Sequence, residues 1–179
     1  HPHSMGAWSP DSKTHVATMS QGDFKANEKS VTLKDATAIN IVLTKNDGTT
    51  IALKENLKLL KDEIIDATVL SKKALVSFLQ EQVKDSKEKG VLFSVHLKAT
   101  MMKVSDPVIF GHVVKVFFAD VFKKHSTTFD KIGINANDGL ENLLKKIQSL
   151  PDSERKQIEL DIENTIKQGP ALAMVNSDK

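Results

Sequence analysis

Two lysines, Lys98 and Lys103, are the residues of this chain best suited to bind or protonate an anion. Lys98 directly follows residues 91–97, an apolar run rich in β-branched and aromatic side chains that predicts a short buried strand. In open α/β sheets, ligands bind outside the carboxyl ends of strands. The order of residues therefore predicts a basic loop at the mouth of a pocket, although exposed loop lysines without a function show the same spacing.

A helix start follows the two lysines. Ser105 and Asp106 can cap a helix, and Pro107 suits a first turn, so the pattern predicts a long apolar helix over residues 108–125. Helix N-termini favour anions because unpaired N–H groups and the helix dipole point there. The combination predicts a carboxylate or phosphate ligand. His112, within the same helix, is interpreted as a packed side chain rather than a ligand.

Composition excludes several kinds of protein. The chain has 179 residues, enough for one domain with a core, and a net charge of +2, which argues against a general nucleic-acid surface or a polybasic membrane patch. It has no cysteine, so thiolate catalysis and cysteine-based zinc sites are excluded. The histidines show no metal-ligand spacing, and neither a dinucleotide fingerprint nor a P-loop is present. One candidate catalytic residue type without a complete constellation predicts a piece of a larger site.

The elements predict an α/β fold, a mixed β-sheet with packed helices, formed by a single partial domain over residues 1–179. Within it we expect an extended N-terminal arm (1–34), a hairpin with a helix–strand unit (35–104), and a mainly helical part with a final short strand (105–179). Strands are predicted at residues 14–19, 28–33, 38–44, 50–54, 91–97 and 172–175. Residues 57–69 fit either a short helix or a loop that leads into a strand at 64–67, and we favour the loop and strand. Helices are predicted at residues 72–89, 108–125, 140–147 and 153–168.

The run VLFSVHLKATMMKVSDPVIFGH resembles monomeric NADP-dependent isocitrate dehydrogenase, the large single-chain bacterial form. HPHSMGAWSPDSKTHVATM, KDEIIDATVLS, residues 135–139 and ALAMVNSDK resemble the same family in the same order. Departures are mild: Thr18 stands where many members have histidine, and residues 21–34 look variable. The resemblance covers essentially the whole chain, and the family is several times longer. It implies an internal fragment of the large domain of an isocitrate/isopropylmalate dehydrogenase-like fold.

The resemblance also implies the chemistry of the parent enzyme, a monomeric, cytoplasmic oxidoreductase of the tricarboxylic acid cycle and glyoxylate bypass. NADP oxidises isocitrate, which then loses carbon dioxide to give 2-oxoglutarate, with Mg²⁺ or Mn²⁺ as Lewis acid. Lys98 matches the family's catalytic lysine. The metal and NADP ligands are expected outside residues 1–179, so the fragment should be inactive alone and bind neither. The alternative is a non-catalytic anion-binding or protein-interaction domain that uses Lys98 and Lys103.

Overall fold

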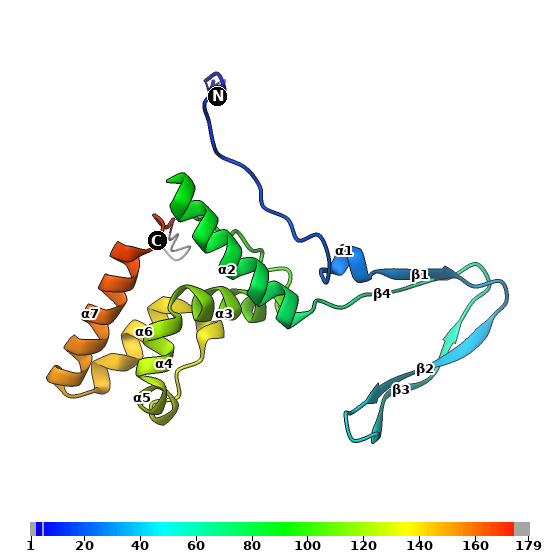
Figure 1. Ribbon diagram of the computed structural model, residues 1–179. Helices are drawn as coiled ribbons and strands as arrows, with labels where there is room; N and C mark the ends of the chain where they lie inside the picture. The colour runs from blue at the N-terminus through cyan, green and yellow to red at the C-terminus, as the bar shows by residue number, and fades with distance from the viewer. Residues whose placement is uncertain (1–2, 5, 174–179) are drawn as a thin grey trace. The chain divides into compact units, whose positions relative to one another are not determined.

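The computed structural model describes residues 3–4 and 6–173, and it divides the chain into two compact units. We call residues 20–71 the hairpin unit, and residues 1–19 with 72–179 the helical unit (Figure 1). The α/β fold class is confirmed, since the chain combines small antiparallel sheets with packed helices. Among the described residues, no helix combines the length and the apolar character that crossing a membrane requires.

The hairpin unit contains two separate antiparallel strand pairs. β1 (Lys29–Thr32) pairs with β4 (Ile64–Ala67), and β2 (Thr37–Thr44) pairs with β3 (Thr50–Leu59). The four predicted strands are present, but β3 runs beyond the expected residues 50–54, because Leu57 pairs with Ile39 and Leu59 with Thr37. A single helical turn, α1 (Phe24–Asn27), was not predicted.

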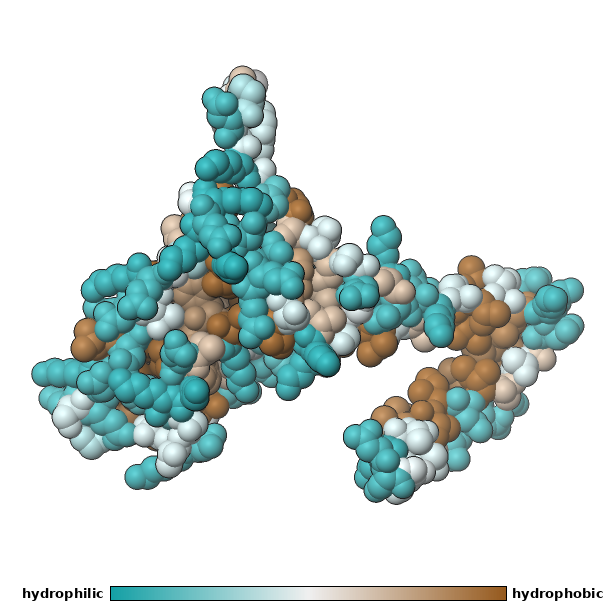
Figure 2. Space-filling view, viewed as in Figure 1, coloured by the Kyte–Doolittle hydropathy of each residue, from teal (hydrophilic) through white to brown (hydrophobic). Residues whose placement is uncertain are grey.

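Apolar side chains of the β2–β3 hairpin are exposed. Leu43 is paired with Ile51 on β3, and the register of the two strands shifts on both sides of Ile41. Ile41, Leu43 and Ile51 are 46%, 47% and 40% exposed. Hydrophobic surface is visible along this hairpin in Figure 2. An isolated two-stranded hairpin is at best marginally stable in water, so this unit holds little folding free energy of its own.

The helical unit holds the main core. Its elements are α2 (Lys72–Lys89), α3 (Ser105–Phe117), α4 (Ala119–Lys124), α5 (Ser126–Lys131), η1 (Ala136–Asp138), α6 (Gly139–Lys146), η2 (Ile147–Ser149) and α7 (Asp152–Gln168). The helices predicted at 72–89, 140–147 and 153–168 are therefore present. Their apolar stripes meet in one core, whose buried side chains include Leu75, Leu79, Val113, Val114, Phe117, Val121, Phe129, Leu143, Ile147, Ile158 and Ile162.

The predicted single helix over residues 108–125 is wrong in two respects. The helix begins earlier, at Ser105, and it breaks at Phe118, whose backbone (φ −102°, ψ 32°) leaves the helical region. The Phe118 ring lies edge-on to Phe117 with ring centroids 5.0 Å apart. Both rings and Val121 are buried. The break lets the chain turn so that apolar side chains on both sides of it reach the same core.

The predicted strand at 91–97 is also wrong. Among the described residues, Phe93 alone pairs, through an isolated parallel bridge with Leu172: the Phe93 N–H donates to the Ala171 carbonyl oxygen at 2.7 Å. The Phe93 ring also stacks on Phe117, with centroids 6.3 Å apart. Because a strand needs a continuous neighbour, one bridge leaves the rest of the segment merely extended. Residues 14–19 form no strand, and residues 174 and 175 of the predicted strand 172–175 lie outside the described part.

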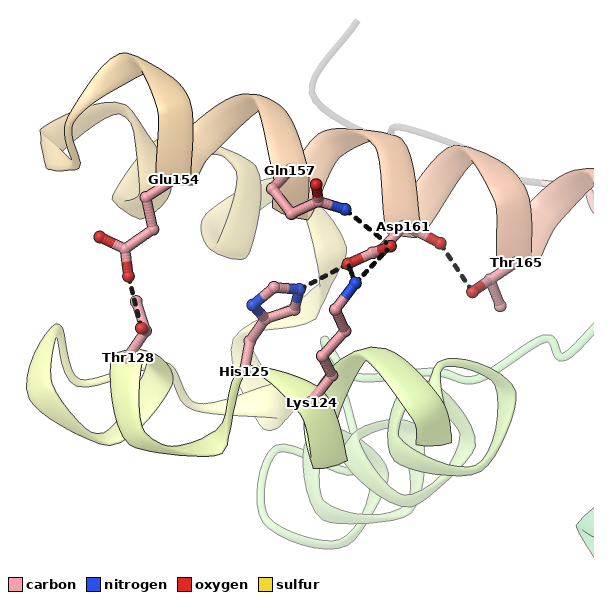
Figure 3. Close-up of polar contacts among 7 residues, drawn as sticks. All are labelled: Lys124, His125, Thr128, Glu154, Gln157, Asp161 and Thr165. Atoms are coloured by element: carbon pink, nitrogen blue, oxygen red, sulfur yellow. Dashed lines mark hydrogen bonds and ion pairs between the residues drawn. The ribbon is translucent and has the colours of Figure 1, made fainter.

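Polar contacts join α7 to the helices before it (Figure 3). The Asp161 carboxylate meets both Lys124 Nζ and His125 Nε2 at 2.7 Å. One turn after His125, the Thr128 hydroxyl in α5 donates to Glu154 in α7 at 2.6 Å. These contacts anchor α4 and α5 against α7 around the buried Ile158 and Ile162.

Candidate functional site

The backbone of Lys98 is held on both sides. Its N–H donates to Oδ2 of Asp106 at 2.7 Å. Its carbonyl oxygen accepts from the amides of Met101 and Met102, each at 2.9 Å, which closes a turn after the lysine. The segment before Lys98 is fixed at Phe93 by the bridge to Leu172. Lys98 therefore occupies a defined position in the loop although no regular strand delivers it.

The Lys98 side chain contrasts with its backbone. Lys98 and Lys103 are both exposed. Within the described part of the chain, neither ammonium takes part in a hydrogen bond or ion pair. The N–H donors of such a lysine remain available to a ligand because no carboxylate occupies them. The arrangement of a fixed backbone and an unengaged ammonium can supply a positive charge or a proton to an anion placed beside the loop.

The N-terminus of α3 is arranged differently from the sequence prediction. Val104 is the N-cap residue and makes no side-chain capping bond. Asp106 lies in the first turn with only 7% of its surface exposed. Its carboxylate points back to Lys98 N–H and also accepts from Ser105 Oγ at 3.2 Å. A buried carboxylate already lies at the positive end of this helix, which weakens its attraction for a further anion.

The helix that follows the Lys98 loop, α3, packs closely against η1 at Gly111. A Cβ built on Gly111 would lie 1.9 Å from Oδ1 of Asn137, so only glycine allows α3 and η1 to approach this closely. His112 is half-buried, as expected of a packed side chain. Burial, followed by the charges of Lys72 and Lys115, lowers the pKa of His112 from 6.5, so the ring is neutral at pH 7.

An open cavity of about 440 Å³ lies elsewhere, between the N-terminal arm and α2. Lys98 is not among its lining residues. His15 Nε2 and Lys89 Nζ both approach Asp85 Oδ2 there, at 3.5 and 2.8 Å. The Asp85 carboxylate on the cavity wall is therefore already engaged by two side chains of the same wall.

The described residues do not fit a metal site, since they contain no group of three His, Asp or Glu side chains able to hold an ion. The sequence singled out Lys98 and Lys103 and identified Asp106 only as a helix-capping candidate. It missed the hydrogen bond from Lys98 N–H to Asp106. The only signal in the sequence was an acidic residue eight positions after Lys98, and this spacing belongs to no established motif.

Comparisons with known proteins agree on one family. The family model described as monomeric isocitrate dehydrogenase matches residues 1–179. An NADP isocitrate dehydrogenase 2 of Colwellia maris is 52% identical over 178 residues, covering 99% of this chain and 24% of the relative. The corresponding protein of Mycobacterium tuberculosis is 50% identical over 177 residues, with 99% and 24% covered. An NADP isocitrate dehydrogenase of Azotobacter vinelandii is 48% identical over 179 residues, with 100% and 24% covered. The chain spans about a quarter of the length of these curated relatives.

Proposed function

Because the chain belongs to the monomeric isocitrate dehydrogenase family, we propose that residues 1–179 are one partial domain of an NADP-dependent isocitrate dehydrogenase to which they contribute Lys98. The parent enzyme oxidises isocitrate and releases carbon dioxide to form 2-oxoglutarate. Support comes from the match over all residues and from relatives that carry this name. The parent acts as a cytoplasmic monomer without nucleic-acid or membrane partners.

The observation that carries the proposal is the contrast at Lys98 between a tethered backbone and an unengaged ammonium. Bound NADP would accept the hydride that leaves C2 of isocitrate. Loss of carbon dioxide then leaves an electron pair on an enolate, which must take up a proton. A lysine ammonium beside the substrate stabilises the negative charge on oxygen or donates a proton to the product.

The remaining catalytic groups are assigned to the part of the parent that residues 1–179 do not include. The described residues hold no metal cage, and we assign no step of this segment to a Mg²⁺ or Mn²⁺ ion. NADP contacts are likewise assigned elsewhere in the parent. The 179-residue chain on its own should therefore neither oxidise isocitrate nor bind NADP appreciably.

The test requires a complete enzyme. In a chimera, residues 1–179 replace the matched segment of the Colwellia maris relative, and isocitrate-dependent NADPH formation is followed by absorbance. We expect Lys98→Met to lower kcat by about 10²–10⁴-fold, the range for removal of a general acid or base. Lys123→Met, an exposed lysine in the last turn of α4, is the control and should leave kcat within about twofold of the unsubstituted chimera. Lys103→Met is measured beside Lys98→Met.

The same variants separate catalysis from the alternative of a non-catalytic anion-binding domain. Such a domain would use both lysines, so both substitutions would weaken anion binding equally and neither would change turnover. Unchanged turnover in Lys98→Met would refute the catalytic assignment.

A further inference from the structure

We infer that Asp106 is a positioning residue for Lys98: its carboxylate fixes the backbone from which the ammonium reaches the substrate. This inference rests on the proposed catalytic role of Lys98 and adds a second residue to the same site. The carboxylate does not touch the substrate. It acts through the Lys98 N–H, to which it lies 2.7 Å away.

Burial and further hydrogen bonds restrict the contact between the Asp106 carboxylate and the Lys98 N–H. Asp106 is 7% exposed, so the hydrogen bond to its charged oxygen is largely protected from water, which strengthens it. The second carboxylate oxygen accepts from Ser105 Oγ at 3.2 Å, and the Asp106 N–H donates to Met102 at 3.1 Å. Both ends of the loop that carries Lys98 are therefore tied to the same carboxylate-bearing residue.

Asp106 itself is held by the core. It lies in the first turn of α3, the helix whose Val113, Val114 and Phe117 are buried. Pro107, which follows it, is tolerated in a first turn because the N–H it lacks would have no partner within the helix. A displacement of α3 would thus move Asp106 and, through it, the Lys98 backbone. The hydrogen bond between the Lys98 N–H and Asp106 therefore links the position of α3 in the core to the position of the Lys98 ammonium.

Loss of this bond should affect turnover more than folding. Without the Asp106 oxygens, the Lys98 N–H keeps no partner in the described loop, while the Lys98 carbonyl retains Met101 and Met102. The backbone of Lys98 then samples several conformations, and a misplacement of about 1 Å can cost on the order of 10²-fold in rate. A purely structural role would instead reduce the fraction of folded enzyme and leave kcat per folded molecule unchanged.

The first experiment measures amide hydrogen exchange by NMR in the 179-residue chain. We expect Asp106→Ala to accelerate exchange of the Lys98 amide at least about tenfold, while the Phe118 amide, bonded to Val114 within the core, stays protected. Asp106→Asn keeps a carbonyl oxygen in the same place and should restore protection to within about threefold of the original chain. Unchanged Lys98 exchange in Asp106→Ala would overturn the inference.

The second experiment measures kcat and KM in the chimera with the Colwellia maris relative. Asp106→Ala should lower kcat about 10- to 100-fold with little change in the KM for NADP, and Asp106→Asn should recover most of the loss. Asp120→Ala, an exposed aspartate in the first turn of α4, is the control and should leave kcat unchanged.

The two assignments fail in different ways. If Lys98→Met abolishes turnover but Asp106→Ala leaves kcat unchanged, Asp106 is not a positioning residue and the proposed function stands. If Lys98→Met leaves kcat unchanged, the catalytic proposal is wrong and the positioning role is overturned with it. If Asp106→Ala lowers only the fraction of folded enzyme and leaves kcat per folded molecule unchanged, the residue is structural and the inference is wrong.

Discussion

His125 Nε2 lies 2.7 Å from Oδ2 of Asp161, and this contact joins the α4–α5 corner to α7 (Figure 3). Both side chains are mostly buried. Lys124 reaches the same carboxylate oxygen, and the Gln157 amide donates to the other at 3.2 Å. One carboxylate therefore gathers three donors from two parts of the helical unit, which makes it a test point for how this unit is held together.

Replacing His125 should destabilise the chain. His125→Ala removes the most buried of the donors to Asp161 and also the ring packed near Phe129, at a centroid distance of 6.0 Å. We expect a loss of about 1–3 kcal/mol of unfolding free energy, measured by urea denaturation, because hydrogen bonds to a charged group contribute on this order. Lys124→Ala is the control: its side chain is 55% exposed, so the loss should stay below about 1 kcal/mol. Equal losses in His125→Ala and Lys124→Ala would contradict the larger contribution that we assign to His125.

Acid should weaken the same contact. Partial burial raises the pKa of the Asp161 carboxyl, but the hydrogen bonds from Lys124, His125 and Gln157 and the charge of Lys124 together outweigh burial, and the pKa lies below its usual 3.8. A carboxyl with a lowered folded-state pKa contributes stability that is present above the unfolded pKa and is lost as pH falls through the folded one.

The original chain and Asp161→Asn should thus differ in unfolding free energy by a constant amount from about pH 5 to 7. Below the unfolded value of 3.8 the difference should shrink as the carboxyl becomes protonated. Urea unfolding of both proteins across this range is the measurement. Curves that stay parallel down to the lowest pH would show that the Asp161 carboxyl has no lowered pKa in the fold.

Gly111→Ala tests the close approach of α3 and η1. Alanine favours a helix by about 1 kcal/mol over glycine, so a helix with free space would gain stability. Here the added Cβ would lie 1.9 Å from Asn137 Oδ1 and 3.0 Å from its backbone nitrogen. We expect a net loss of about 1–3 kcal/mol, measured by thermal unfolding. The double variant with Asn137→Ala removes the nearest atom and should recover part of the loss; no recovery would mean that the backbone contact dominates.

Two neighbouring residues of α7 provide a matched pair for the core. Ile158 is 0% exposed and Leu160 is 48% exposed on the same helix. Ile158→Ala should cost about 2–5 kcal/mol because it opens a cavity among packed side chains. Leu160→Ala should change the unfolding free energy by no more than about 0.5–1 kcal/mol. Similar values in urea unfolding would mean that α7 is not packed through its Ile158 face.

Features that depend on local signals could be predicted from the sequence. The helix expected at residues 72–89 is α2, and Gly90 follows it with φ +66°, as a residue that ends a helix in the left-handed region does. The hairpin at β2–β3 was also anticipated, because Asn46, Asp47 and Gly48 favour a tight turn. The family resemblance is confirmed by the match over residues 1–179.

Features that depend on distant partners could not be predicted. Residues 91–97 have strand composition, but Leu172 is the only described residue that pairs with them. The break at Phe118 follows from the position of the core around Phe117 and Val121, which no local pattern reveals. At the site, the sequence predicted exposed lysines beside a helix start, whereas the Asp106 contact became visible only once the loop was folded. The catalytic role of Lys98 stays a prediction.

The Phe93–Leu172 bridge also has a consequence for how this protein can be shortened. The extended segment before Lys98 is held at Phe93 by backbone hydrogen bonds to Ala171 and Ala173, far downstream in the sequence. Trimming the chain back to the end of α7 would remove both hydrogen bonds and leave the Phe93 ring held by its contact with Phe117. We expect such a variant to keep its helical circular dichroism signal, while the segment before the Lys98 loop has lost its backbone hydrogen bonds to residues 171 and 173.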